Sequence, residues 1–164
     1  MRSVPLIAVL AGCAVALVGC VSFIENTDAD LSLPDAKAYT QTVERDIADA
    51  LPADLVATMD QKETGVFLPC SRDGGEQWAG GLTAQMQSPV DAALVLGPIE
   101  ERFAVDGKLA LRRREDDEDS ILEIVGHHHS AWIVRYDRET GAFRVTSFSP
   151  CIYLPEEVWR GDKY

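Results

Sequence analysis

The chain has 164 residues, of which 15 are basic and 27 are acidic, so its formal net charge is −12 at neutral pH. Phosphate backbones are repelled by such a charge, which excludes nucleic acid as a partner. The length is enough for one domain with its own hydrophobic core, so folding requires neither a metal nor a dense set of disulfides.

The N-terminal segment has the pattern of an export signal. Arg2 is its only charged residue up to residue 24, and residues 4–18 form an apolar core of signal-peptide length. The core ends in Leu17-Val18-Gly19-Cys20. These four residues resemble the lipobox of bacterial lipoprotein precursors. The resemblance implies that residues 1–19 are a lipoprotein signal peptide and that Cys20 is acylated as the first residue of the mature protein.

Two alternatives for this segment stay open. Residues 4–24 are uncharged and, at about 1.5 Å per residue, could span about 30 Å of hydrocarbon as an uncleaved helix. Equally, Gly-Cys could be incidental within an ordinary cleaved signal. The positive-inside rule leaves Arg2 in the cytoplasm, so every version exports the rest of the chain. We therefore expect a domain on the extracytoplasmic face of the cell membrane, held there by a lipid anchor.

The first half of the domain is predicted to hold one helix and two strands. Residues 20–31 are expected to form a lipidated N-terminus and a polar tether, and a single domain is expected over residues 32–164. Ser32, Pro34 and Asp35 predict a helix start, followed by an apolar stripe of about 18 residues that ends at Pro52. Residues 54–64 have no clear pattern. Strands are expected at residues 66–68 and 77–86, separated by a turn at residues 71–76.

The second half is predicted to hold one helix and four strands. Residues 88–91 repeat the cap, proline and acid, and Gly97-Pro98 is expected to kink or restart the helix. Alternation of period two then predicts consecutive hairpins. The apolar positions are Leu109 and Leu111, Leu122 and Ile124, Trp132 to Tyr136, and Phe143 and Val145. The fold class is therefore α+β, with two main helices packed on a mostly antiparallel sheet that ends in a four-strand meander.

The cysteines predict one disulfide. Cys13 lies inside the leader and Cys20 would be acylated, which leaves Cys70 and Cys151 as a pair in an oxidising compartment. There is no Cys-x-x-Cys spacing, so a structural bridge is favoured over a redox or metal site.

These features together resemble small mycobacterial-type lipoproteins of the LppA-like sort. The residues that carry the resemblance are the lipobox, Pro69-Cys70 before a glycine-containing turn, the strand with Trp78, and a closing Pro150-Cys151. The resemblance implies the fold and the location. It brings no activity, so it names no reaction and no ligand.

His127-His128-His129 is the one conspicuous chemical motif. On a strand, His127 and His129 would point the same way and could share a metal, with a third ligand from Glu123, Asp119 or the acidic turn. Gly126 and Ser130 instead indicate a hairpin connection. The acidic run at residues 115–119 lacks the spacing and the glycine of a calcium loop, so we interpret it as a solvated turn.

The remaining candidates for chemistry are few. No nucleophile elbow, phosphate-binding loop or dinucleotide motif is present in the sequence. Trp78, Trp132 and Trp159 are either core residues or, if exposed on a sheet face, a binding platform. The sequence therefore predicts a non-enzymatic, lipid-anchored envelope protein without a cofactor, whose partner is an envelope protein or a small ligand. The alternative is a metal-binding protein that uses His127 and His129. A hydrolase is a more distant possibility.

Overall fold

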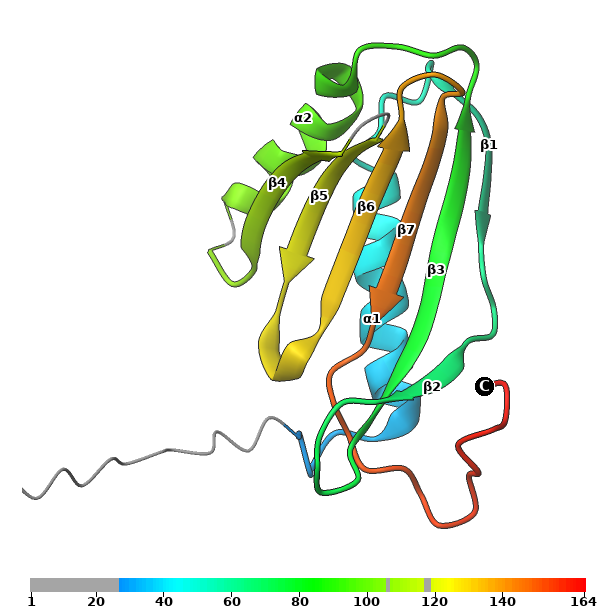
Figure 1. Cartoon of the computed structure of the whole chain (residues 1–164), viewed down its shortest axis with the longest axis vertical. Coiled ribbons are helices and arrows are strands. Elements are labelled where there is room, and N and C mark those ends of the chain that lie inside the picture. Colours follow the sequence, from blue (N-terminus) through cyan, green and yellow to red (C-terminus); the bar gives the residue numbers. More distant parts are fainter. Residues whose placement is uncertain (1–26, 106, 117–118) are drawn as a thin grey trace, which may run out of the picture.

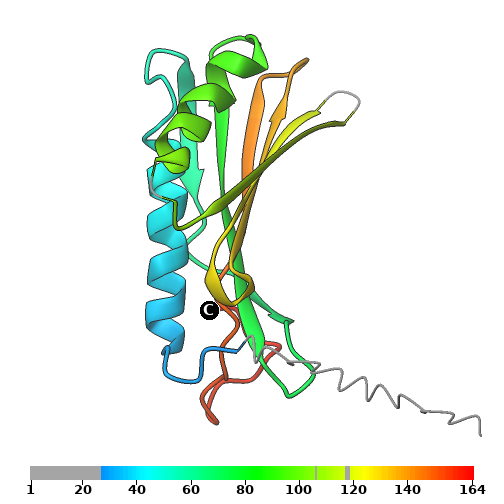
Figure 2. The same ribbon diagram turned by 90° about the vertical axis from the view of Figure 1, so that its left-hand side faces the viewer.

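The computed structural model describes residues 27–105, 107–116 and 119–164. Within these ranges, two helices lie on one face of a seven-stranded antiparallel sheet and none lies on the other face (Figures 1 and 2). The predicted α+β class is confirmed. The elements are α1 (Leu33–Ala48), β1 (Val56–Gln61), β2 (Val66–Pro69), β3 (Glu76–Met86), α2 (Ala92–Ala104), β4 (Ala110–Asp116), β5 (Asp119–Val125), a short 3₁₀ turn (His127–His129), β6 (Ala131–Asp137) and β7 (Ala142–Phe148).

The sheet order is β1-β3-β7-β6-β5-β4, and β2 pairs with the other end of β3. The last four strands form the predicted meander. α2 carries the chain from β3 to the far edge of the sheet, and the meander then returns until β7 lies beside β3, with Leu82 opposite Val145. Helix α1 covers β3 and β7, whereas α2 covers β4, β5 and β6. No helix in the described ranges is both long and apolar enough to cross a bilayer.

Helix α1 begins where its capping residues predict. The Ser32 side chain accepts a hydrogen bond from the backbone N–H of Asp35, and Pro34 occupies the first turn. The helix ends at Ala48 rather than at Leu51. The N–H groups of Ala50 and Leu51 bond three residues back, to Ile47 and Ala48, so the chain leaves the helix through a tighter turn before Pro52.

Helix α2 begins at Ala92, with Asp91 as the capping residue that accepts from the N–H of Ala93, slightly later than the sequence predicts. It continues through Pro98 as one helix instead of restarting there. Val95, Leu96 and Ile99 lie on both sides of the proline and are fully buried. Packing on the sheet therefore holds the two halves together in spite of the missing N–H.

Strand β1 lies in the segment that has no clear sequence pattern. It pairs with β3 at the edge of the sheet, with an irregularity in register between Val56 and Thr58. Its four central residues are exposed, so no apolar alternation marks it as a strand.

Two hydrophobic clusters hold the fold together. The larger lies between the helices and the sheet and contains Trp132, whose indole N–H donates to the carbonyl of Thr40 at 3.1 Å. The smaller surrounds Trp78 at the end where the β2–β3 hairpin meets the C-terminal segment. Both tryptophans are fully buried and therefore belong to the core, whereas Trp159 is 69% exposed. Trp159 lies beyond the last strand, so it forms no platform on the sheet.

The C-terminal segment, residues 149–164, closes the lower end of the molecule (Figure 1). Ile152 exchanges backbone hydrogen bonds with Glu76, and the indole N–H of Trp78 donates to the carbonyl of Tyr164 at 2.8 Å. The carboxylate of Glu76 is buried and lies 2.6 Å from the guanidinium of Arg160. Its oxygens have no well-directed hydrogen bond from any described residue, so Arg160 supplies their main compensation.

The expected tether is shorter than the sequence predicts. Thr27 is buried, and the backbone N–H of Asp28 donates to the carbonyl of Cys151 at 2.7 Å. Residues 27–31 therefore lie against the domain instead of leading away from it. Residues 20–26, together with Cys13 and Cys20, lie outside the described residues.

Candidate functional site

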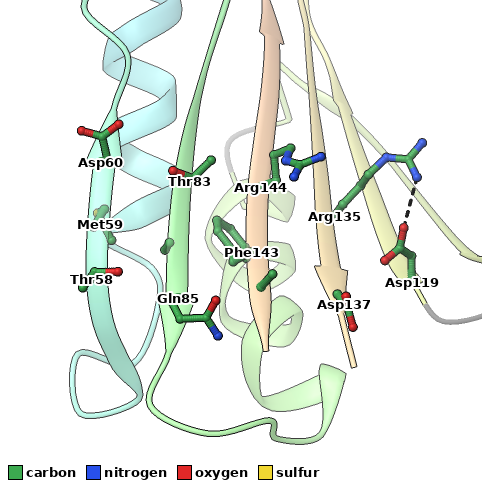
Figure 3. Close-up of a pocket in the computed structure, with 12 residues that line it drawn as sticks. Thr58, Met59, Asp60, Thr83, Gln85, Asp119, Arg135, Asp137, Phe143 and Arg144 are labelled. Carbon is green, nitrogen blue, oxygen red and sulfur yellow. Dashed lines mark hydrogen bonds and ion pairs between the residues drawn. The ribbon is translucent and has the colours of Figure 1, made fainter. Parts of the chain in front are cut away.

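A shallow groove crosses the helix-free face of the sheet and is the best candidate for a functional site. It has a volume of about 460 Å³ and runs over β1, β3, β7 and β6 (Figure 3). Its polar side chains come from alternate strand positions, since every second residue faces away from the helices. The lining residues are Thr58, Met59, Asp60, Thr83, Ala84, Gln85, Asp119, Arg135, Asp137, Ala142, Phe143 and Arg144.

The strand register places four polar residues in one row across the groove. Asp60 lies opposite Thr83, Thr83 opposite Arg144, and Arg144 opposite Arg135. Neighbouring strands are about 4.8 Å apart, so the row spans some 14 Å from an acid to a pair of arginines. The close-up shows Arg144 and Arg135 extending in the same direction across the sheet, with Thr83 and Asp60 on the far side of Arg144 (Figure 3).

The charges in the row are compensated unequally. The guanidinium of Arg135 forms an ion pair with Asp119 at 3.2 Å. Arg144 and Asp60 are both exposed, and neither makes an ion pair or a side-chain hydrogen bond with any residue in the described ranges. The carboxylate of Asp137 accepts hydrogen bonds from residues of the turn that follows it. Hydrogen bonds from the Thr140 side chain and backbone N–H hold the pKa of Asp137 below its usual value.

Ile121 is buried although its side chain lies on the helix-free face of the sheet. Ile121 lies opposite Arg135 and Arg114 on the helix-free side, yet it is fully buried. Leu122 and Ile124, on the alternate positions of β5, face the helices as predicted. The arginines beside Ile121 thus lie over apolar surface, as long cationic side chains commonly do.

The histidine motif lies in the hairpin connection and not on a strand. His127, His128 and His129 are exposed in the 3₁₀ turn between β5 and β6, and His128 and His129 have φ of 48° and 62°. The hairpin connection indicated by Gly126 and Ser130 is therefore observed, and the arrangement with His127 and His129 on one strand face is not. The candidate third ligands pair with arginines instead: Glu123 with Arg114 at 3.0 Å and Asp119 with Arg135.

No set of three or more His, Cys, Asp and Glu side chains gathers within the described part of the chain in a way that could hold a metal. The nearest acid to the turn is Asp28, whose Oδ2 lies 3.8 Å from Nε2 of His128. His128 also accepts, through its carbonyl, the backbone N–H of Cys151 at 2.7 Å. The turn therefore connects the sheet to the first described residues, through Asp28, and to the C-terminal segment, through Cys151.

The predicted disulfide is present. Cys70 and Cys151 are bonded, with their Cα atoms 5.9 Å apart and 81 positions apart in sequence. Cys151 is fully buried, and its sulfur lies 3.6 Å from the hydroxyl of Thr27. The bridge therefore ties together the first described residues, the β2–β3 hairpin and the C-terminal segment.

The acidic turn between β4 and β5 is only partly described, because residues 117 and 118 lie outside the described ranges. Glu115 accepts a hydrogen bond from Ser120 at 2.6 Å and lies within ion-pair distance of Arg113 and Arg138. These two arginines partly compensate the negative charge of the turn, and Arg138 comes from the neighbouring connection between β6 and β7.

A buried acid lies beneath the groove, on the helix side of the sheet. Glu44 of α1 is fully buried and accepts hydrogen bonds from Ser147 of β7 and from Gln61 of β1, the latter at 2.7 Å. Burial raises the pKa of Glu44, although both hydrogen bonds oppose the shift. The sequence offers one indication of this position: Glu44 follows Thr40 by four residues and precedes Ile47 by three, on the buried face of α1.

The comparisons with known proteins give no family for this chain: no family model, no curated protein and no solved structure matches it.

Proposed function

We propose that this chain is a lipid-anchored, extracytoplasmic envelope protein that acts as a binding module, and that the groove on the helix-free sheet face is its binding surface. The observation that carries the proposal is the position of both helices on one side of the sheet. They cover the apolar face and leave a polar, hollowed face uncovered across four strands. Uncovered sheet faces are common in antiparallel folds, but here the face is hollowed and carries charges that no described residue pairs.

The anchor belongs to the proposal through the lipobox at Cys20. Seven residues, from Cys20 to Asn26, precede the first docked residue, Thr27. Fully extended, they reach at most about 25 Å. An acylated Cys20 would therefore hold the domain close to the bilayer, with the end that carries the disulfide nearest to the lipid. The Cys70–Cys151 bond supports export, since structural disulfides persist in oxidising compartments.

Binding is favoured over catalysis by the chemistry of the groove. Its lining contains no serine, cysteine, histidine or lysine that could act as a nucleophile or a base. Two of its three carboxylates are engaged, Asp119 by Arg135 and Asp137 by Thr140. Side chains of this kind hold and orient a ligand.

The anchor is tested by metabolic labelling of intact cells with an alkyne fatty acid. The wild-type protein is expected to take up the label and to lose its leader, whereas Cys20→Ala is expected to remain an unlabelled precursor. Label retained by Cys20→Ala would contradict the lipid anchor.

The binding surface is tested by in-cell photo-crosslinking. A photoreactive amino acid at Gln85, which lines the groove, is compared with the same residue at Ala93, which is exposed on α2. We expect a discrete adduct from position 85 and none from position 93. A second substitution in the groove, such as Thr83→Arg, should abolish the adduct from position 85. Equal adducts from both positions, or none from Gln85, would contradict a binding role for this face.

A further inference from the structure

Two arginines stand directly opposite each other in the middle of the helix-free face. Arg135 of β6 and Arg144 of β7 are register partners, and like charges that face each other across strands destabilise a sheet. Asp119 compensates Arg135, but no described residue compensates Arg144. The chain has 27 acidic and only 15 basic residues, so carboxylates are abundant, yet none in the described ranges pairs with Arg144.

The carboxylate in the same row, that of Asp60, forms no ion pair with Arg144. Asp60 lies two strands away, beyond Thr83, which places the two backbones about 10 Å apart. Asp60 and Arg144 therefore line the same groove with opposite charges and do not neutralise each other.

We propose that Arg144, together with Arg135, binds the anionic group of a small ligand, a carboxylate or a phosphate, in this groove. The guanidinium is planar and presents paired N–H donors that match both groups in a bidentate arrangement. An anion between the two guanidinium groups would relieve the repulsion between them. This inference rests on the function proposed above and names the chemistry of the ligand.

The surrounding charges limit the ligand to one anionic group. The chain as a whole is strongly acidic, so a polyanion such as a nucleic acid would be repelled from the rest of the surface. Within the groove, Asp60 at the far end of the row disfavours a second negative charge and favours a hydrogen-bond donor or a cation there. The ligand would therefore bind in one orientation, with its anionic group at Arg144 and its hydrogen-bond donor or cationic end toward Asp60.

The test uses the full-length chain in nonionic detergent, titrated separately with inorganic phosphate and with acetate at constant ionic strength. The arginine Nε–Hε signals are followed by NMR. We expect saturable shifts of the Arg144 and Arg135 signals, and the stronger of the two titrations identifies the anion as phosphate or carboxylate. Arg144→Gln is expected to weaken binding at least tenfold, whereas Arg144→Lys, which keeps the charge but not the planar fork, is expected to retain part of it.

Arg112→Gln is the matched control. Arg112 is exposed on the same face, on the edge strand β4, and its substitution removes the same charge. It is expected to change the affinity less than twofold. Equal losses in Arg112→Gln and Arg144→Gln would show general charge attraction, and unshifted Arg144 and Arg135 signals would show that neither anion binds; either result overturns the inference. Adducts at Gln85 that persist in that case would leave the binding function standing.

Discussion

Removal of the Cys70–Cys151 bond should cost this protein a large part of its stability. The bond joins residues 81 positions apart, and a closed loop of that length restricts the unfolded chain. In the chain-entropy model the restriction is worth about 4.5 kcal/mol at 25 °C. Domains of this size are stable by only about 5–15 kcal/mol, so the double variant Cys70→Ala/Cys151→Ala should lie near the limit of folding.

Equilibrium urea unfolding of the full chain in nonionic detergent measures this loss. With a denaturant slope of about 1.5–2 kcal/mol/M, the midpoint should fall by about 2–3 M. The slope itself should rise, because an unfolded chain without the crosslink exposes more surface. The control is the reduced wild-type protein, which should unfold at the same urea midpoint as the double variant. Reductant should not change the midpoint of the double variant. A loss below about 1 kcal/mol would refute the reasoning, since it would mean that the unfolded chain is not restricted by the bond.

Three further substitutions test the energetics of the fold. Because burial raises the pKa of Glu44, this side chain contributes favourably to stability below its pKa in the unfolded chain, and the contribution is lost as the pH rises through its pKa in the folded state. Glu44→Gln should therefore unfold at a higher urea concentration than the wild type at pH 8. A stability gain that does not shrink at pH 4 would show that ionisation of Glu44 is not its cause. Arg160→Ala leaves the buried carboxylate of Glu76 uncompensated and should lower the unfolding free energy by about 1–3 kcal/mol, more than Glu76→Gln does, in matched thermal melts. Gly81→Ala should cost about 1–3 kcal/mol, because a Cβ there would overlap the carbonyl oxygen of Val145 in the neighbouring strand. Gly97→Ala, where nothing lies within 4 Å of the added atom, should be neutral or should stabilise by up to about 1 kcal/mol, because Gly97 lies inside α2 and alanine favours the helix. Equal losses at the two glycines would exclude the overlap as the cause.

The helices, the meander and the disulfide could be predicted because each rests on a local or a countable signal. Ser32 caps α1 as its sequence motif predicts, whereas the second motif indicates a helix start at Ser88 and the observed cap is Asp91, three residues later. Strands β6 and β7 of the meander bury alternate residues, which gives period two directly, whereas β5 also buries Ile121 on its other face. The disulfide follows from two cysteines remaining once Cys13 is assigned to the leader and Cys20 to the lipid anchor.

Strand β1 and the groove could not be predicted, for a related reason. Met59 and its neighbours lie at an exposed edge, so burial imposes no alternation on them. The groove depends on which strands are neighbours, and Arg144 of β7 meets Thr83 of β3 only through the long connection that contains α2. Alternation indicates which side chains leave the core, but not which of them converge. Glu44 escaped notice because a glutamate on an amphipathic helix is ordinarily placed at the surface.

The adjacency of β3 and β7 has a consequence for the order of folding. The central pairing of the sheet brings Leu82 against Val145, so neither half of the chain contains a complete sheet of its own. Loop closure over such a separation is slow, and the two hydrophobic clusters cannot close before residue 148 is available. The sheet can therefore be completed only after almost the whole of the domain is available.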